Sequence, residues 1–180
     1  MRFPSRSAAE SRRAASALGA AIDAVLADAG GPLVVALIGP LGAGKTEWVR
    51  GLAEGLGVDP ALVASPTFVI ASEYPGRRRL AHVDLYRIGS EAELEAAGFL
   101  DLLVPGTVVA VEWADRFPAS LPADRIEVRI TRPAQGGPEA REIELRATGE
   151  QAWKAIGRWT VEGRQASGAS VQRGEAGRSS

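Results

Sequence analysis

The chain has 180 residues, of which 46% are hydrophobic, a net charge of −1, no cysteine and a single histidine. This apolar content supports the core of one domain, and the near-neutral charge argues against an electrostatic grip on nucleic acid by this chain alone. The lack of cysteine excludes disulfides, thiolate zinc sites and thiol nucleophiles, and the single histidine excludes a histidine-rich metal site. The composition is compatible with a reducing cytoplasm. No apolar run approaches the roughly 18 residues of a membrane helix.

The first predicted elements are a helix, a strand and a second helix. A capping-box pattern, Ser7-Ala8-Ala9-Glu10, precedes apolar residues at helical intervals and predicts a helix over about 7–29. A Gly-Gly-Pro break follows, and an unbroken apolar run then predicts a strand over 33–38. The next helical pattern is expected to end near Gly55 or Gly57.

Between that strand and the second helix lies Gly39-Pro40-Leu41-Gly42-Ala43-Gly44-Lys45-Thr46, which has the spelling of a phosphate-binding P-loop. The glycines let the backbone turn its N–H groups inward as an anion-binding nest, and the helix adds its positive end. Lys45 would reach the β- and γ-phosphates of a nucleotide, and the Thr46 hydroxyl would ligate Mg²⁺. The predicted nucleotide-binding residues are Gly39, Leu41, Gly42, Ala43, Gly44, Lys45 and Thr46.

The next predicted elements are two strands joined by a turn. Ser65-Pro66-Thr67-Phe68 leads into the first strand, which is expected to end at Tyr74. The basic triplet Arg77-Arg78-Arg79 is interpreted as a solvated hairpin tip, with a docking patch for RNA or an acidic partner as the alternative. The strand that follows alternates over 80–87 and places His82 and Asp84 on one face.

The second half of the chain predicts a mixed sheet. A second capping box opens a short helix that stops around Gly98, and a continuous apolar run over 107–111 is typical of a central strand. Alternating segments over 125–130 and 142–145 form a predicted antiparallel hairpin, and a last helix is expected over 150–159.

The fold class is therefore α/β, a single P-loop NTPase-like domain with a mixed parallel and antiparallel sheet flanked by helices. We expect this domain to span residues 1–162. The Gly, Ser, Gln and Arg composition of 163–180 is typical of a disordered tail.

Two carboxylates are expected near the P-loop. Asp84 and Glu112 both come at strand ends, where open α/β sheets place their ligands. Either could hold Mg²⁺, directly or through water, while the other polarises the attacking water. Thr67 follows a proline and could sense the γ-phosphate, or it could simply be a β-branched residue that starts a strand.

Other residues near these strand ends are weaker candidates. Arg87 either neutralises phosphate charge or pairs at the surface, and His82 is interpreted as a packed or hydrogen-bonded sheet residue. Trp113 either covers the nucleotide or fills the core, and we favour the core. No Asn-Lys-x-Asp-like segment that would read guanine occurs, which favours ATP.

The P-loop, Ser65-Pro66-Thr67-Phe68, the run from His82 to Arg87, and Glu112-Trp113 together resemble the TsaE (YjeE) family of ATPases. The likeness runs over roughly residues 14–147 and keeps order and spacing. It implies a small Mg²⁺-dependent ATPase that works with the TsaB and TsaD subunits in threonylcarbamoyladenosine modification of tRNA. The tRNA would be contacted indirectly, through the assembly.

The resemblance also implies residue roles. Lys45 and Thr46 would bind phosphate and Mg²⁺, Thr67 and Asp84 would be switch-like, and Glu112 would be a metal-site or water-activating acid. Pro40 departs from the family loop, where an aspartate is expected.

Two other functions share the same P-loop. A small-molecule phosphotransferase could use Arg77-Arg78-Arg79 as a lid over the phosphates, and it would need an acceptor for turnover. A nucleotide-gated binding module would bind ATP tightly without hydrolysing it.

Overall fold

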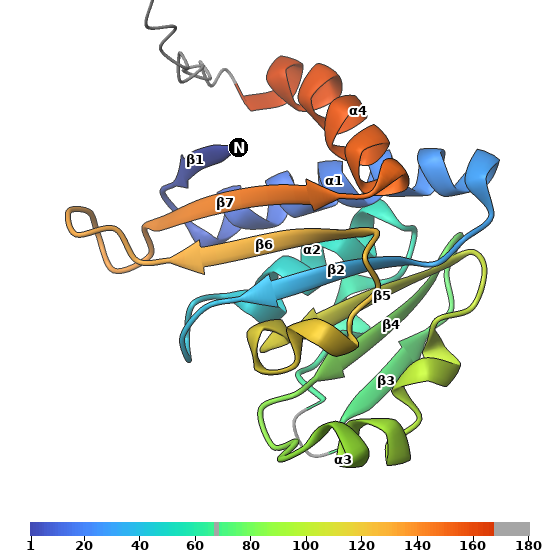
Figure 1. Cartoon of the computed structure of the whole chain (residues 1–180). Helices are drawn as coiled ribbons and strands as arrows, with labels where there is room; N and C mark the ends of the chain where they lie inside the picture. Colours follow the sequence, from blue (N-terminus) through green and yellow to red (C-terminus); the bar gives the residue numbers. More distant parts are fainter. Residues whose placement is uncertain (67–68, 168–180) are drawn as a thin grey trace, which may run out of the picture.

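The computed structural model describes residues 1–66 and 69–167, and it contains a seven-stranded sheet in the order β1-β7-β6-β2-β5-β4-β3 (Figure 1). The strands are β1 (Arg2–Ser5), β2 (Leu33–Ile38), β3 (Ala71–Tyr74), β4 (Arg79–Asp84), β5 (Thr107–Glu112), β6 (Arg125–Thr131) and β7 (Arg141–Thr148). The helices are α1 (Ala8–Ala29), α2 (Lys45–Gly55), α3 (Glu91–Ala96) and α4 (Glu150–Ser167), with 3₁₀ turns η1 (Pro60–Leu62), η2 (Phe99–Leu102), η3 (Ala114–Arg116) and η4 (Pro118–Ser120).

The sheet is mixed, as predicted. Strands β4, β5, β2 and β6 run parallel to one another, whereas β3, β7 and β1 are antiparallel to their neighbours. The carboxyl ends of the four parallel strands therefore meet at one edge of the sheet. Ligand sites of open α/β sheets form at such an edge.

The central strands are buried on both faces. In β2, Leu33, Val35 and Leu37 belong to the apolar cluster under α1, α2 and α4. The alternate residues Val34, Ala36 and Ile38 belong to a second cluster, together with side chains from α3 and η2. This double cover explains why the sequence of β2 is an unbroken apolar run rather than an alternating one.

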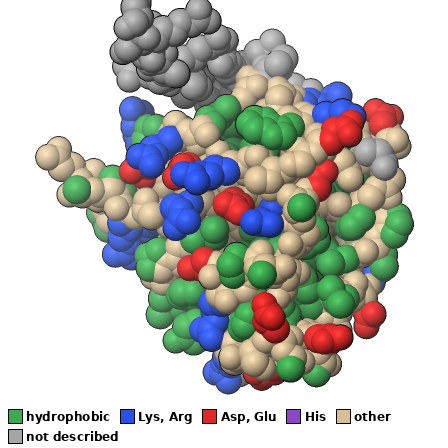
Figure 2. Space-filling model, viewed as in Figure 1, with side chains coloured by type: hydrophobic (Ala, Val, Ile, Leu, Met, Phe, Trp, Pro, Cys, Tyr) green, Lys and Arg blue, Asp and Glu red, His purple; other side chains and the backbone are tan. Residues whose placement is uncertain are grey.

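The outer strands β6 and β7 are covered on one face only. Their inward side chains, such as Val128 and Leu145, lie in the cluster under the helices. Figure 2 shows basic and acidic side chains interspersed over the open face, where Arg125 pairs with Glu127 and Arg146 pairs with Glu144. The alternating sequence of the predicted hairpin reflects this one-sided burial.

Local signals predicted the helix starts correctly. The Ser7 hydroxyl accepts the Glu10 N–H at 3.2 Å, and Ser90 accepts the Glu93 N–H at the same distance. The end of α4 was predicted wrongly, because the helix continues beyond residue 159 to Ser167. An interior glycine such as Gly163 costs a helix only about 1 kcal/mol and does not by itself end one. The remainder of the predicted tail, 168–180, lies outside the described residues.

Strand β1 was not predicted. It pairs with β7, more than a hundred positions away in the sequence. Its four residues are too few to show the alternation of polar and apolar side chains that identifies a strand. Strand β4 is shorter than predicted and ends at Asp84. Within the described ranges, no helix is long and apolar enough to cross a membrane.

The Arg77-Arg78-Arg79 triplet is only partly the solvated tip that was predicted. Arg77 and Arg78 both donate to Asp23 of α1, and Arg79 pairs with Glu73. The side chain of Arg78 is only 18% exposed. The prediction failed for Arg78 because its carboxylate partner comes from a helix that is distant in the sequence.

Candidate nucleotide-binding site

The P-loop motif over residues 39–46 includes the turn that follows β2 and the first two residues of α2. Gly42 and Gly44 have φ values of 71° and 103°, a left-handed conformation that favours glycine. The first helical bond of α2 runs from the Trp48 N–H to the Gly44 carbonyl at 3.0 Å. The N–H groups of residues 44–47 therefore have no partner within the helix, and together with the helix dipole they form an arrangement that can bind an anion.

Lys45 lies buried beneath this loop. Its Nζ donates to the carbonyls of Gly39 at 2.8 Å and Pro40 at 3.0 Å, and it lies 3.7 Å from the centre of the Trp113 ring. Burial lowers the pKa of the Lys45 ammonium, while the charges of Glu112, Asp84 and Asp115 oppose that shift. A cation held mainly by loop carbonyls and a ring face can transfer to phosphate oxygens without breaking an ion pair.

Glu112 connects the loop to β4 and β5. Its Oε1 atom accepts the Thr46 hydroxyl at 2.7 Å and also lies 2.9 Å from His82 Nε2. An ionised carboxylate only accepts hydrogen bonds, so its contact with His82 requires a tautomer that carries a proton on Nε2. His82 is fully buried, and its Nδ1 has no hydrogen-bond partner among the described residues.

Asp84 is paired in register with Glu112 across β4 and β5. Its Oδ2 accepts the Ser65 hydroxyl at 3.1 Å, and its Oδ1 accepts the Tyr86 N–H at 2.9 Å. The residue is only 3% exposed. Asp84 therefore ties the segment that precedes β3 to the chain that leaves β4.

Trp113 lies at this site rather than wholly in the core, so the favoured sequence interpretation was only partly right. Its backbone has a φ of 59°, and its half-buried ring also contacts Tyr86, with ring centres 5.0 Å apart. Tyr86 is 47% exposed, which leaves one edge of this aromatic pair open to solvent.

The comparisons with known proteins identify the family. The model of the family described as "Threonylcarbamoyl adenosine biosynthesis protein TsaE" matches residues 5–143. The chain belongs to the TsaE family. The resemblance that the sequence motifs suggested is thereby confirmed.

Proteins named tRNA threonylcarbamoyladenosine biosynthesis protein TsaE are similar over most of the chain. The Streptomyces coelicolor protein is 42% identical over 123 residues, which cover 66% of this chain and 82% of that protein. The Treponema pallidum protein is 35% identical over 139 residues, which cover 77% and 97%. The crystal structure of Bacillus subtilis YdiB is 29% identical, covers 91% of this chain and 95% of that one, and has a TM-score of 0.66. This likeness confirms the predicted P-loop NTPase-like fold.

In this TsaE-family chain the predicted site residues gather at one sheet edge, with one exception. The P-loop, Asp84 and Glu112 are brought together, and His82 joins them through Glu112. Thr67 lies outside the described residues, so its predicted role stays a prediction. Arg87 is exposed just past the end of β4.

The oxygen donors suit a Mg²⁺ ion that is held mainly by other ligands. Over residues 1–66 and 69–167, no group of three or more His, Asp or Glu side chains is placed to hold a metal. The site offers the Thr46 hydroxyl and the carboxylates of Glu112 and Asp84. Mg²⁺ commonly uses one or two protein carboxylates, with phosphate oxygens and water as its remaining ligands.

Sequence reasoning missed Arg141, whose guanidinium reaches the P-loop from β7. Its Nε donates to the Ala43 carbonyl at 2.8 Å across 98 positions of sequence. No local pattern marks such a contact, because it depends on how the β6–β7 hairpin meets the end of β2.

Proposed function

We propose that this chain binds ATP with Mg²⁺ at the P-loop and hydrolyses it, as a cytoplasmic subunit acting with TsaB and TsaD. The cycle would serve threonylcarbamoyladenosine modification of tRNA, and the tRNA would be contacted through the partner subunits. Family membership supports the pathway, and the near-neutral charge of the chain fits a subunit that leaves the RNA to its partners.

The observation that carries the proposal is the contact between Thr46 and Glu112. In this contact the Thr46 hydroxyl, which is expected to ligate the metal, donates to the buried carboxylate of Glu112. Lys45 and the N-terminus of α2 lie next to it and can bind phosphate groups. Burying polar groups costs free energy unless they are hydrogen-bonded, so a loop that served only as a turn could be stabilised more simply by apolar side chains at these positions.

Each residue then has a role. Lys45 binds the β- and γ-phosphates, Thr46 and Glu112 hold the metal, and Asp84 couples the site to the segment after Ser65. We propose Thr67, in that segment, as a sensor of the γ-phosphate. Mg²⁺, when bound, neutralises charge on the phosphate oxygens.

The phosphotransferase alternative finds less support. It would use the arginine triplet as a mobile lid over the phosphates, but Arg77 and Arg78 are engaged with Asp23 of α1. These ion pairs would have to break before the triplet could close over a nucleotide.

ATP hydrolysis by this chain alone, and again with TsaB, TsaD and tRNA, tests the proposal. We expect slow turnover alone and clear stimulation by the assembly, since no arginine is supplied by the P-loop itself. Turnover that appears only when a small-molecule acceptor is added would favour a kinase. Tight binding without turnover in any mixture would favour the binding module.

Two substitutions separate phosphate binding from chemistry. Lys45→Ala should weaken ATP binding at least about tenfold, because a charge-assisted contact to phosphate is lost. Lys154→Ala is the matched control, since Lys154 is the other lysine and pairs with Glu150 on the exposed face of α4. Glu112→Ala should retain ATP binding and lose hydrolysis. Normal ATP affinity in Lys45→Ala would contradict the site assignment.

A further inference from the structure

Arg141 begins β7 and lies outside the motifs of the sequence analysis. Strand β6 runs parallel to β2, so the hairpin that follows β6 turns back beside the P-loop. The guanidinium makes four hydrogen bonds, all of them to backbone carbonyls: Ala43 at 2.8 Å, Gly42 at 3.3 Å, Pro138 at 2.8 Å and Ala140 at 2.8 Å. The N–H groups of Arg141 thus bind backbone carbonyls of the P-loop and of the β6–β7 hairpin.

The two P-loop carbonyls matter because of peptide geometry. In a planar trans peptide the C=O and the following N–H point in opposite directions. When the Ala43 carbonyl is held toward β7, the Gly44 N–H must point to the other side of the loop. That N–H belongs to the set of residues 44–47 that the helix leaves without partners.

The loop needs such a restraint from outside. Gly42 and Gly44 are both left-handed, and glycine passes between conformations at little cost, so the peptides on either side of Ala43 could turn over. A turned peptide would present a carbonyl oxygen, in place of an N–H, to a phosphate. The Ala43 N–H is already used within the loop, where it donates to the Pro40 carbonyl at 3.1 Å.

We propose that Arg141 is a positioning residue that sets the P-loop peptides in the orientation that binds nucleotide phosphates. It acts from the carbonyl side of the loop and does not touch the nucleotide. The inference rests on the proposed nucleotide binding and adds a residue to it from the far half of the chain.

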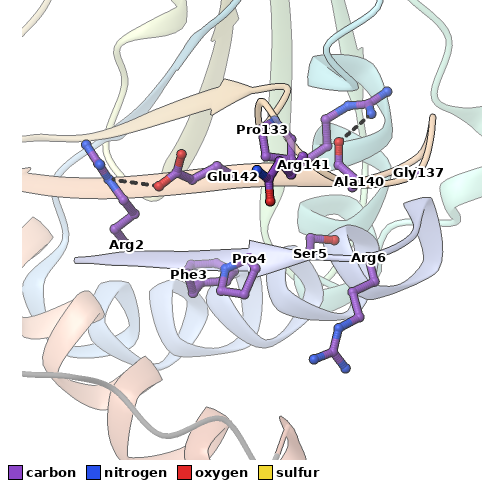
Figure 3. A pocket seen from close by; sticks show the side chains of 12 residues that line it. Arg2, Phe3, Pro4, Ser5, Arg6, Pro133, Gly137, Ala140, Arg141 and Glu142 are labelled. Atoms are coloured by element: carbon purple, nitrogen blue, oxygen red, sulfur yellow. Dashed lines mark hydrogen bonds and ion pairs between the residues drawn. The ribbon is translucent and has the colours of Figure 1, made fainter.

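The surroundings of Arg141 allow a direct test. It lines a cleft of about 760 Å³ between β1 and the β6–β7 hairpin, together with Pro133, Gly137 and Glu142 (Figure 3). The hydrogen bonds of the guanidinium to Gly42 and Pro138 lie at the exposed surface, so Arg141→Ala would leave the Gly42 carbonyl reachable from solvent. A free guanidinium ion could then occupy the place of the lost group.

The experiment is isothermal titration of ADP and AMP into the full chain and its Arg141→Ala, Arg141→Lys and Arg146→Ala variants. We expect Arg141→Ala to weaken ADP binding about tenfold and AMP binding much less, since the P-loop backbone serves the outer phosphates. Arg141→Lys should fall between, because an ammonium lacks the planar fork that reaches two carbonyls. Arg146 lies on the same strand and pairs with Glu144 at the surface, so Arg146→Ala should bind as the wild type does.

Millimolar guanidinium chloride should restore ADP binding in Arg141→Ala, whereas sodium chloride at the same ionic strength should not. A folded Arg141→Ala that binds ADP as tightly as the wild type would overturn the inference and leave the proposed function standing. An equal loss for ADP and AMP, without rescue, would mean a general structural role and would also overturn it. If the wild type bound no nucleotide, the proposed function and this inference would fall together.

Discussion

Glu112 is the side chain around which the candidate site is arranged. One oxygen atom accepts from both Thr46 and His82, and the residue is only 4% exposed. A buried carboxylate needs such donors, because removing a charged group from water without a hydrogen-bond partner carries a large desolvation penalty. If the Thr46 hydroxyl turns toward a metal ion, as we propose, His82 remains the donor that fixes Glu112.

His82 should therefore affect catalysis through Glu112. We expect His82→Leu to lower ATP turnover about tenfold, which corresponds to losing about 1.4 kcal/mol from a hydrogen bond to a charged group. The KM for ATP should change little, because His82 does not reach the phosphate loop directly. Steady-state kinetics with the partner subunits would measure both quantities.

The conservative variant His82→Gln is the control, since its amide keeps an N–H donor of similar reach. It should recover part of the lost turnover. A folded His82→Leu protein with wild-type turnover would show that Glu112 does not need the hydrogen bond from His82 for catalysis.

At the scale of elements, α1 and α2 approach so closely at three positions that only glycine fits there. A Cβ atom at Gly19 would lie 2.6 Å from the Leu52 carbonyl oxygen and 3.2 Å from the Gly55 Cα. Cβ atoms at Gly51 and Gly55 would collide with backbone atoms of α1. Because α2 begins at Lys45, this contact also sets the direction in which the P-loop helix points.

We expect Gly19→Ala to lower the free energy of unfolding by about 2 kcal/mol, the range typical of overpacked helix contacts. Gly157→Ala is the matched control in α4, where a new Cβ meets nothing within 4 Å. This second change should raise stability by up to about 1 kcal/mol, because alanine favours helix more than glycine does. Urea unfolding of both variants would measure the difference, and equal stability would contradict the close approach.

Elements with local signals were the ones that the sequence could predict. An apolar run predicts the bounds of β2, and a capping box predicts the start of α1. The P-loop was predicted from its sequence motif. Asp84 and Glu112 were predicted together because parallel strands bring their carboxyl ends to one edge. Strand β1, the ion pairs of Arg78 and the reach of Arg141 could not be predicted, because each depends on a partner that folding brings from far along the chain.

At the scale of the whole molecule, the two ends of the described chain meet on the same half of the sheet (Figure 1). The Met1 ammonium donates to the Leu145 carbonyl of β7 at 2.7 Å. Trp159 of α4 donates to the Ala14 carbonyl of α1 at 3.0 Å, and its ring lies 5.4 Å from that of Phe3. One tryptophan thus contacts the first strand and the first helix while it lies on the last helix.

Trp159→Ala should accordingly destabilise the whole domain without altering the nucleotide site. The side chain is 9% exposed, and removing it should cost about 3 kcal/mol and lower the Tm by about 10 °C. Affinity for ADP should stay within about twofold of the wild type under native conditions, because the P-loop lies at the carboxyl edge of β2, whereas Trp159 contacts Ala14 and Phe3. Thermal melts with and without ADP would separate the two quantities.

Trp153→Ala is the matched control, since Trp153 lies on the same helix and is 63% exposed, and its Tm should match that of the wild type. A single sheet buried beneath α1, α2 and α4 should unfold as one unit, so circular dichroism and tryptophan fluorescence should give one coincident transition. If Trp159→Ala instead melted in two steps, with the ADP-stabilised step unchanged, α4 would be a separate unit. The first strand and the last helix would then contribute nothing to the stability of the P-loop.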